Sequence, residues 1–411
     1  MTAQPGRSHS ERPLEQSGLS TLFATSLIQI AGSFAIAGPF AISILIVQNE
    51  HLPESWMGYY TSLIYAAAII GSMVTTRLLA SFSIRFVQFA ALLATGLGFE
   101  LFCQVGTDPL PLATAIAGIM LMGLAYGVIV PSSSLALAEC YSKRMQPLVV
   151  SVRQTGVPVG TAMVALIAPV VAHHYGWQHM AAVVWALVAV TALLAKRGLR
   201  DFGAKANHPP GREHVLSALQ VSLAEPATRR LALVSGSYGI NQAALTTYLV
   251  PSLVWLHGMS VGRSAGYLAI ATMAGAAARI VFGMTTARFG RANLHLGLLG
   301  ILSGFAWLLL LWPLPSFMRL MAGSVLLGIS AMGWNGILLA EIALAAPSGK
   351  TAEAVATGTS FAYLGVLVAP LIYVQLDHAI DSKRAALAGL AVLAVSAGFA
   401  LLRSSDNLST R

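Results

Sequence analysis

Charged side chains are scarce in this sequence. They make up only 9% of its 411 residues, against roughly 25% in an average soluble domain. Hydrophobic residues account for 56% of the chain, and the mean hydropathy is +0.73. A large soluble protein needs a polar surface around its core, so this composition excludes a water-soluble globular protein. We therefore expect the chain to lie in a lipid bilayer.

The sequence also has few of the residues that build catalytic and metal centres. Its 2 cysteines, Cys103 and Cys140, show no CxxC or Cys–His spacing, which argues against a disulfide framework and a zinc site. It has no P-loop, nucleophile elbow or cluster of His, Asp and Glu. The 24 Lys and Arg residues form no stripe of the kind that binds nucleic acid. We expect no enzymatic activity, no cofactor, no metal site and no nucleic-acid partner.

Long apolar runs dominate the chain. Twelve of them could cross a ~30 Å hydrocarbon core as helices of ~20 residues. Their spans are 20–48, 57–80, 84–105, 110–138, 147–172, 177–196, 229–256, 262–286, 293–313, 317–345, 353–376 and 385–403. The predicted fold class is an all-α membrane protein. Its predicted parts are a tail at 1–19, a six-helix bundle at 20–196, a cytoplasmic linker at 197–228, a second six-helix bundle at 229–403 and a tail at 404–411.

The distribution of basic residues predicts the orientation in the membrane. With the N-terminus inside, most of the 24 Lys and Arg residues fall at inner loops and ends, and only Arg263, Arg319, Lys383 and Arg384 fall outside. Cytoplasmic loops of membrane proteins carry such an excess of Lys and Arg. We predict a multi-pass protein of the cell inner membrane with both termini in the cytoplasm.

The two halves of the chain resemble each other in sequence. Leu166–Pro169 (LIAP) in the fifth run has a counterpart in Leu367–Pro370 (LVAP) in the eleventh. Leu137–Glu139 in the fourth run has one in Leu339–Glu341 in the tenth. The members of the two pairs are separated by nearly equal numbers of residues. Because many transporters consist of repeats with a site at their interface, the pattern predicts a six-plus-six duplication.

The loop after the second helix of the C-terminal half reads GMTTARFGR, from Gly283 to Arg291. It resembles the major facilitator superfamily, whose signature at this place is G-x-x-x-D-R-x-G-R. Gly283, Arg288, Gly290 and Arg291 match that signature, and Ala287 stands in place of the usual aspartate. The resemblance implies the two-bundle fold of that superfamily and a gating role for the four matching residues.

Two acidic residues are candidates to pair with the basic loop ends. Glu341, at the inner end of the tenth run, is a partner for Arg288 or Arg291, and Glu139 is a partner for Arg85. Such pairs would form a conformational gate at the inner face. The alternative is a set of solvated end charges that follow the positive-inside rule.

Arg279 is the charge placed deepest in an apolar run. It precedes Arg288 by nine residues, so it lies ~13 Å from the inner end of the eighth helix at ~1.5 Å per residue. An ion at this depth needs a partner or a wet cavity, and a guanidinium binds a carboxylate through two parallel hydrogen bonds. We expect Arg279 to bind substrate, with a structural arginine paired to backbone carbonyls as the alternative. The segment Ala278–Gly283 is also similar to monocarboxylate and oxalate transporters, which implies a carboxylate contact for Arg279.

Arg153 is the second arginine within an apolar run. It lies ~9 Å from the inner end of the fifth helix, a depth from which an arginine can snorkel to the interface. A substrate contact, an inner-gate pair and snorkelling all stay open for it. The stretch Arg153–Pro158 (RQTGVP) is similar to a segment of bacterial facilitators of uncertain substrate. Gly156 and Gly160 share one helix face, which favours close helix packing over substrate contact.

Uncharged polar side chains are expected to line a central cavity. The candidates are Gln29 in the first run, Tyr126 in the fourth, Tyr238, Asn241 and Gln242 in the seventh, and Asn335 in the tenth. Buried amides are costly in lipid unless they find partners. In the superfamily that the chain resembles, these four helices line the central pathway.

These residues predict a secondary transporter. We expect it to move a small organic anion, a monocarboxylate or an aromatic acid, inward by alternating access, and to act as a monomer. No acidic residue lies at the centre of the first, fourth, seventh or tenth run, so exchange, uniport and symport all stay open. The alternative function is a proton-coupled drug or metabolite efflux antiporter of the same superfamily, whose glycine–proline signature in helix five is not reproduced here.

Overall fold

The computed structural model describes residues 11–106, 108–141, 145–199, 223–289, 291–314, 316–346 and 351–406. Every regular element in these ranges is a helix. Most of the predicted linker at 197–228, the outer parts of both predicted tails and Gly290 lie outside the described residues.

The first six predicted runs form the first half of the structure. Its elements are α1 (Glu11–Ala41), α2 (Ser43–Asn49), α3 (Trp56–Ser81), α4 (Ile84–Phe102), α5 (Pro109–Cys140), α6 (Gln146–Gln154), α7 (Gly156–Tyr175), η1 (Trp177–His179) and α8 (Met180–Ala195). The second half consists of α10 (Pro226–Ala243), η2 (Ala244–Tyr248), α11 (Leu249–His257), α12 (Val261–Phe289), α13 (Ala292–Leu311), α14 (Phe317–Met332), α15 (Asn335–Ala345), α16 (Thr351–Ile380) and α17 (Lys383–Asp406).

The membrane-spanning segments follow the predicted runs. Within the described residues, 11 helices are long and apolar enough to cross a membrane, and each coincides with one predicted run. The remaining run, 229–256, is divided into α10, the π-helical turn η2 and α11. Such a turn is a local widening of an α-helix, so these three pieces form one path. The prediction of an all-α membrane protein is confirmed, and the expected twelve segments agree with the structure.

Two of the interrupted runs, the fifth and the tenth, have a break that bears on the site. α6 ends at Gln154 and α7 begins at Gly156. Pro158 has no N–H group for the Gln154 carbonyl four residues earlier, and its ring crowds that carbonyl. α14 ends at Met332, before α15 begins at Asn335. Since the last carbonyls of a helix have no partner within it, both breaks present backbone oxygens to other groups.

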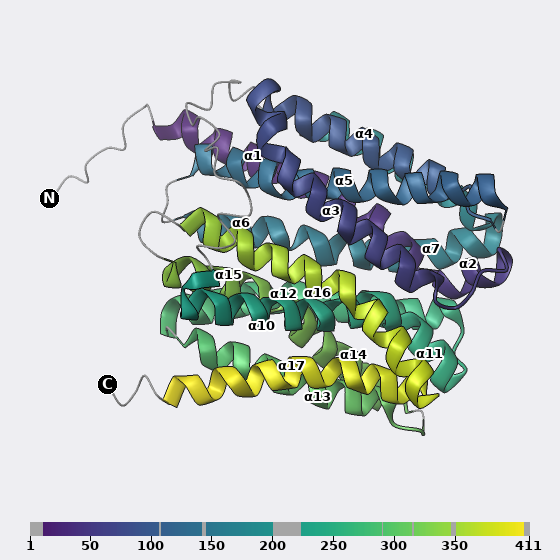
Figure 1. Ribbon diagram of the computed structural model, residues 1–411. Helices are drawn as coiled ribbons and strands as arrows, with labels where there is room; N and C mark the ends of the chain where they lie inside the picture. Colours follow the sequence, from purple (N-terminus) through teal and green to yellow (C-terminus); the bar gives the residue numbers. More distant parts are fainter. Residues whose placement is uncertain are drawn as a thin grey trace, which may run out of the picture.

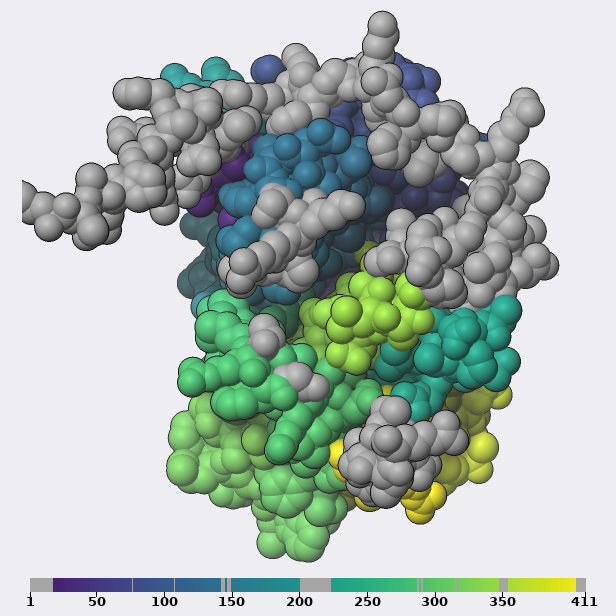
Figure 2. Space-filling model, turned by 90° about the vertical axis from the view of Figure 1, so that its left-hand side faces the viewer, coloured from purple at the N-terminus to yellow at the C-terminus, as the bar shows by residue number. Residues whose placement is uncertain are grey.

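The elements form two groups that lie side by side (Figure 1). Helices α1 to α8 pack together, as do α10 to α17, and the groups meet where α7 packs against α12 and α3 against α16. We call the end where α1 begins and α17 ends the terminal face, and the opposite end, with α2 and α11, the far face (Figure 1). Seen from the terminal face, the first group is the mainly blue mass above, and the second is the teal-green to yellow mass that abuts it below (Figure 2).

Glycines allow the closest contact between α1 and α7. A Cβ atom on Gly160 would collide with the carbonyl oxygen of Ile30, and one on Gly156 would lie 3.1 Å from the Cβ of Gln29. The prediction that these two glycines serve helix packing is therefore confirmed. Their contact brings Gln29 next to the broken end of α6, where Arg153 lies.

Candidate functional site

Arg153 lies in the last turn of α6 and points into the protein. Its side chain is 0% exposed, and Nη1 donates a hydrogen bond of 2.9 Å to Oε1 of Gln29. Gln29 in turn donates from Nε2 to Oγ of Ser33, at 3.2 Å. The Nε and Nη2 atoms of Arg153 are buried and have no hydrogen-bond partner among the described residues. Snorkelling, one of the alternatives for this residue, does not occur in this structure.

Arg279 of α12 connects the two interrupted helices. Nε donates to the carbonyl oxygen of Met332 at 2.8 Å, and Nη1 donates to that of Gln154 at 2.6 Å. These oxygens lie at the C-terminal ends of α14 and α6, where a cation is favoured by the helix dipole. Because α6 belongs to the first half and α14 to the second, Arg279 joins the halves. This is the carbonyl pairing that the sequence suggested as an alternative to substrate binding.

Three tyrosines lie near the two arginines. Tyr126 of α5 lies beside the side chains of Ser33 and Gln29, in the neighbourhood of both arginines. Tyr65 of α3 and Tyr363 of α16 form an edge-to-face pair with ring centroids 5.7 Å apart, and they face each other across the two halves. Tyr363 lies in the neighbourhood of Arg153, and Tyr65 in that of Arg279.

Sequence reasoning missed Tyr65 and Tyr363. Both lie in apolar runs that were not expected to line the pathway. The usable signal was the phenol group itself, since a buried tyrosine hydroxyl usually finds a polar partner. We call Arg153, Arg279, Gln29, Tyr126, Tyr65 and Tyr363 together the central cluster.

The central cluster contains no acidic residue. Among the described residues, neither guanidinium forms an ion pair, and their hydrogen-bond acceptors are one side-chain amide and two backbone carbonyls. Arg279 is only 4% exposed, so both cations are shielded from solvent. Two permanently charged groups therefore face only neutral dipoles in the middle of the protein.

The remaining predicted cavity residues lie elsewhere or are unbonded. The Tyr238 hydroxyl donates to the carbonyl of Leu296, and its ring stacks on Trp334 inside the second half. The Asn241 Oδ1 atom accepts hydrogen bonds from side chains of α13. Gln242 and Asn335 are half-buried, and their amides form no hydrogen bond within the described part of the chain.

The predicted gating residues carry exposed or half-buried charges. Arg288 lies over the ring of Phe289, 5.6 Å from its centroid, and Arg291 is exposed. Over the described ranges, Glu341 forms no ion pair with either arginine, and Arg85 forms none with Glu139. Gly283 has open space around it. Gly290 lies outside the described residues, and the gate stays a prediction.

At the far face the two halves are in contact. Thr61 Oγ1 and Thr247 Oγ1 lie 3.0 Å apart, and Ser62 donates to the carbonyl of Leu367 at 2.8 Å. Nearer the surface, Lys383 pairs with Glu54 and lies over the ring of Trp255.

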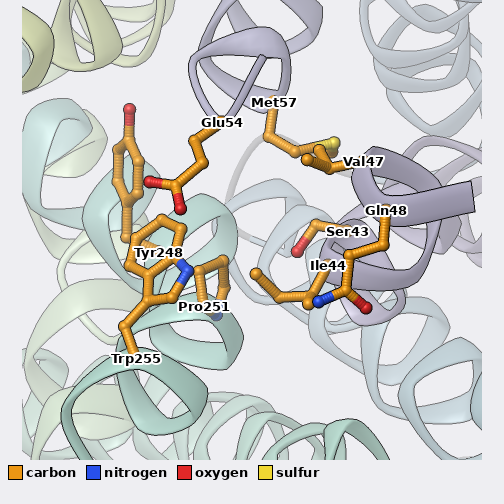
Figure 3. A pocket seen from close by; sticks show the side chains of 9 residues that line it. All are labelled: Ser43, Ile44, Val47, Gln48, Glu54, Met57, Tyr248, Pro251 and Trp255. Carbon is orange, nitrogen blue, oxygen red and sulfur yellow. The ribbon is translucent and has the colours of Figure 1, made fainter. Parts of the chain in front are cut away.

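A pocket of about 50 Å³ lies between the halves at this place, room for only a few water molecules. Figure 3 shows Tyr248 and Trp255 on one side of it and Ser43 on the other. The path from the far face to the central cluster is therefore closed.

Comparisons with known proteins agree with this arrangement. The family model of the Major Facilitator Superfamily matches residues 22–370. A bacterial homologue of the human lysosomal transporter Spinster, in an inward-facing and unoccupied conformation, is 15% identical, with a TM-score of 0.74 over 96% of this chain and 98% of that chain. A structure of the same homologue in its occupied conformation is also 15% identical, with a TM-score of 0.70 over 94% and 96%.

A mutant of the nucleoside transporter NupG is 12% identical, with a TM-score of 0.74 over 93% of this chain and 99% of that chain. At these identities the likeness concerns the fold. No curated protein matches the sequence. The similarity of the Arg279 segment to monocarboxylate and oxalate transporters stays a prediction. The chain belongs to the major facilitator superfamily, and it is a multi-pass secondary transporter and not an enzyme.

Proposed function

We propose that this protein carries a small organic anion, a carboxylate, across the inner membrane. The supporting observation is the pair of buried guanidinium groups, Arg153 and Arg279, without an acidic partner in the described residues. Removing a cation from water costs several kcal/mol even after the protein relaxes, and neutral dipoles offset only part of that cost. An anion bound between the two groups offsets more of it.

The position of the cluster fits transport between the halves. Arg153 and Tyr126 belong to the first half, and Arg279 and Tyr363 to the second. A ligand held by both sets contacts the two bundles at once, so it can influence their relative position. Alternating access then requires that the contacts at the far face open when those toward the terminal face close.

The other polar residues have distinct proposed roles. Gln29 and Tyr126 contact the anion next to the guanidinium of Arg153. The side-chain amides of Gln242 and Asn335 line the pathway in the second half. Tyr238 and Asn241 stabilise the second half internally, since the Tyr238 hydroxyl and the Asn241 Oδ1 atom are bonded within it. The rings of Tyr65 and Tyr363 suit a ligand with an aromatic or other flat apolar part.

We further propose that the protein takes up the anion as a monomer, with both chain termini in the cytoplasm.

The test of the anion function uses purified protein in liposomes, assayed with labelled pyruvate, lactate, oxalate and 4-hydroxybenzoate, and in parallel with lipophilic cations. We expect flux of at least one carboxylate and none of the cations. Flux of lipophilic cations alone would support an efflux function and contradict the anion assignment.

A further inference from the structure

The hydrogen-bond pattern of Arg153 differs from that of Arg279 in one respect that concerns ligand binding. A guanidinium offers a carboxylate its Nε–H and Nη2–H bonds in parallel along one edge, and these two donors match the two oxygens of the anion. In Arg153 this edge has no partner in the part of the chain that the structure describes, where Nη1 alone is bonded. In Arg279 Nε already donates to Met332, so the same edge is interrupted.

The orientation of Arg153 is set by the first helix. Gln29 accepts from Nη1 and donates to Ser33, one helical turn further along α1. The glycine contact between Gly156 and Gln29 keeps α1 and α7 close at this point. The amide of Gln29 therefore points the free edge of the guanidinium away from α1.

We propose that the Nε/Nη2 edge of Arg153, oriented by Gln29, is the primary binding element for the carboxylate, and that Arg279 is a positioning residue. This inference rests on the proposed function. The ligand class is a planar anion with two equivalent oxygens, held by two parallel hydrogen bonds. Since Arg153 is 0% exposed, the anion reaches this edge only when the two halves move apart.

Arg279 acts through the ends of the interrupted helices. Its bond to Gln154 holds the C-terminal end of α6, the residue next to Arg153, and its bond to Met332 holds the end of α14. Its charge still attracts the anion into the cluster. Its two bonds fix the place of α6 and with it the place of Arg153.

The test measures ligand-induced thermal stabilisation of the purified full-length protein. The probes are pyruvate, oxalate and 4-hydroxybenzoate, with 4-hydroxybenzamide as an uncharged analogue of nearly the same shape. Stabilisation reports binding to the folded state without knowledge of the coupling ion. We expect the wild-type protein to be stabilised by at least one acid and not by the amide.

Four variants separate the roles of the two arginines. Arg153→Lys keeps a charge but loses the two-donor edge, so its Kd for the acid should rise at least 100-fold. Arg279→Lys loses the pair of bonds that holds α6, so it should unfold at a lower temperature and bind the acid several-fold more weakly, far less than the loss in Arg153→Lys, and still reject the amide. Gln29→Leu should raise Kd about tenfold. Arg263→Lys, an exposed arginine on α12, is the matched control and should change nothing.

Gln29→Glu gives an independent reading if Arg153→Lys fails to fold. Glutamate is isosteric with glutamine and can still accept a hydrogen bond from Nη1 of Arg153, but its carboxylate neutralises the charge of Arg153. We expect loss of acid binding in a folded protein.

Two different results would contradict the two proposals, the role of Arg153 and the anion function. If wild type binds the acid, but Arg279→Lys loses the preference for acid over amide and Arg153→Lys keeps it, the assignment of the primary element is wrong and the anion function stands. If no carboxylate stabilises the wild-type protein and none is transported, the anion function fails, and this inference fails with it.

Discussion

Pro370 of α16 lies against Gly58 of α3, so that a Cβ atom on Gly58 would come within 2.9 Å of the proline Cβ. The corresponding pair is Pro169 of α7 and Gly262 of α12, where the same distance would be 3.8 Å. Both prolines end the repeated Leu-x-Ala-Pro sequence, and each faces a glycine of the opposite half. The sequence echo thus marks two equivalent contacts across the interface, one of them tight and one loose.

Gly58→Ala should weaken the closed far face. The added methyl group meets a rigid proline ring and lies 3.2 Å from the Tyr248 hydroxyl. We therefore expect the free energy of unfolding to fall by about 1–3 kcal/mol, as in overpacked protein cores. Thermal unfolding and carboxylate flux in liposomes measure the effect. Gly262→Ala is the matched control and should be neutral or slightly stabilising, because alanine favours helix over glycine. If both variants changed stability and flux equally, the two proline–glycine contacts would not differ in tightness as the structure indicates.

Arg279→Lys should destabilise the protein more than Arg279→Met. An ammonium keeps the buried charge but cannot span the carbonyls of both Gln154 and Met332, and a hydrogen bond to a charged group contributes about 1.5–3 kcal/mol. Methionine also leaves both carbonyls unpaired, yet it removes the cost of burying a cation. Denaturant or thermal unfolding of both variants checks the order. If the methionine variant were less stable than the lysine variant, burial of the positive charge at position 279 would not be costly, and this prediction would be wrong.

A short cross-link between positions 54 and 383 should stop transport. Glu54 and Lys383 form an ion pair across the halves, and their side chains are 57% and 32% exposed, so the pair itself contributes only about 0–1 kcal/mol. Cysteines at both positions, in a background with Cys103 and Cys140 replaced by alanine, would be bridged by a thiol-specific cross-linker. We expect flux to vanish and to return after reductive cleavage. Undiminished flux through the bridged protein would show that the far face need not open.

Reporter fusions should place both ends of the chain in the cytoplasm. The excess of basic residues at inner loops predicts this orientation. Fusions of alkaline phosphatase after Lys205 and Arg411 should be inactive, and fusions of a fluorescent protein at the same positions should fluoresce. A third fusion near Arg263, in a predicted outer loop, should give the opposite pattern. Phosphatase activity at either of the first two positions would contradict the predicted orientation.

The sequence by itself determined the spanning segments and one of the helix breaks. Because a helix must stay apolar over the thickness of the bilayer, the run lengths predict where each span begins and ends. The observed bounds of α3, Trp56–Ser81, lie within a residue of the predicted 57–80. Pro158 likewise requires the carbonyl of Gln154 to lose its helical partner, whatever the surrounding fold.

Only the tertiary structure decided which groups meet at the centre. The partners of Arg279 are backbone oxygens on two other helices, and the edge-to-face pair of Tyr65 and Tyr363 joins residues from different halves. Spacing along one helix shows which residues share a face, but it does not show how that helix is rotated toward its neighbours. The free edge of Arg153 depends on that rotation. It exists because α1 presents Gln29 to Nη1 while none of the described helices brings an acceptor to Nε and Nη2.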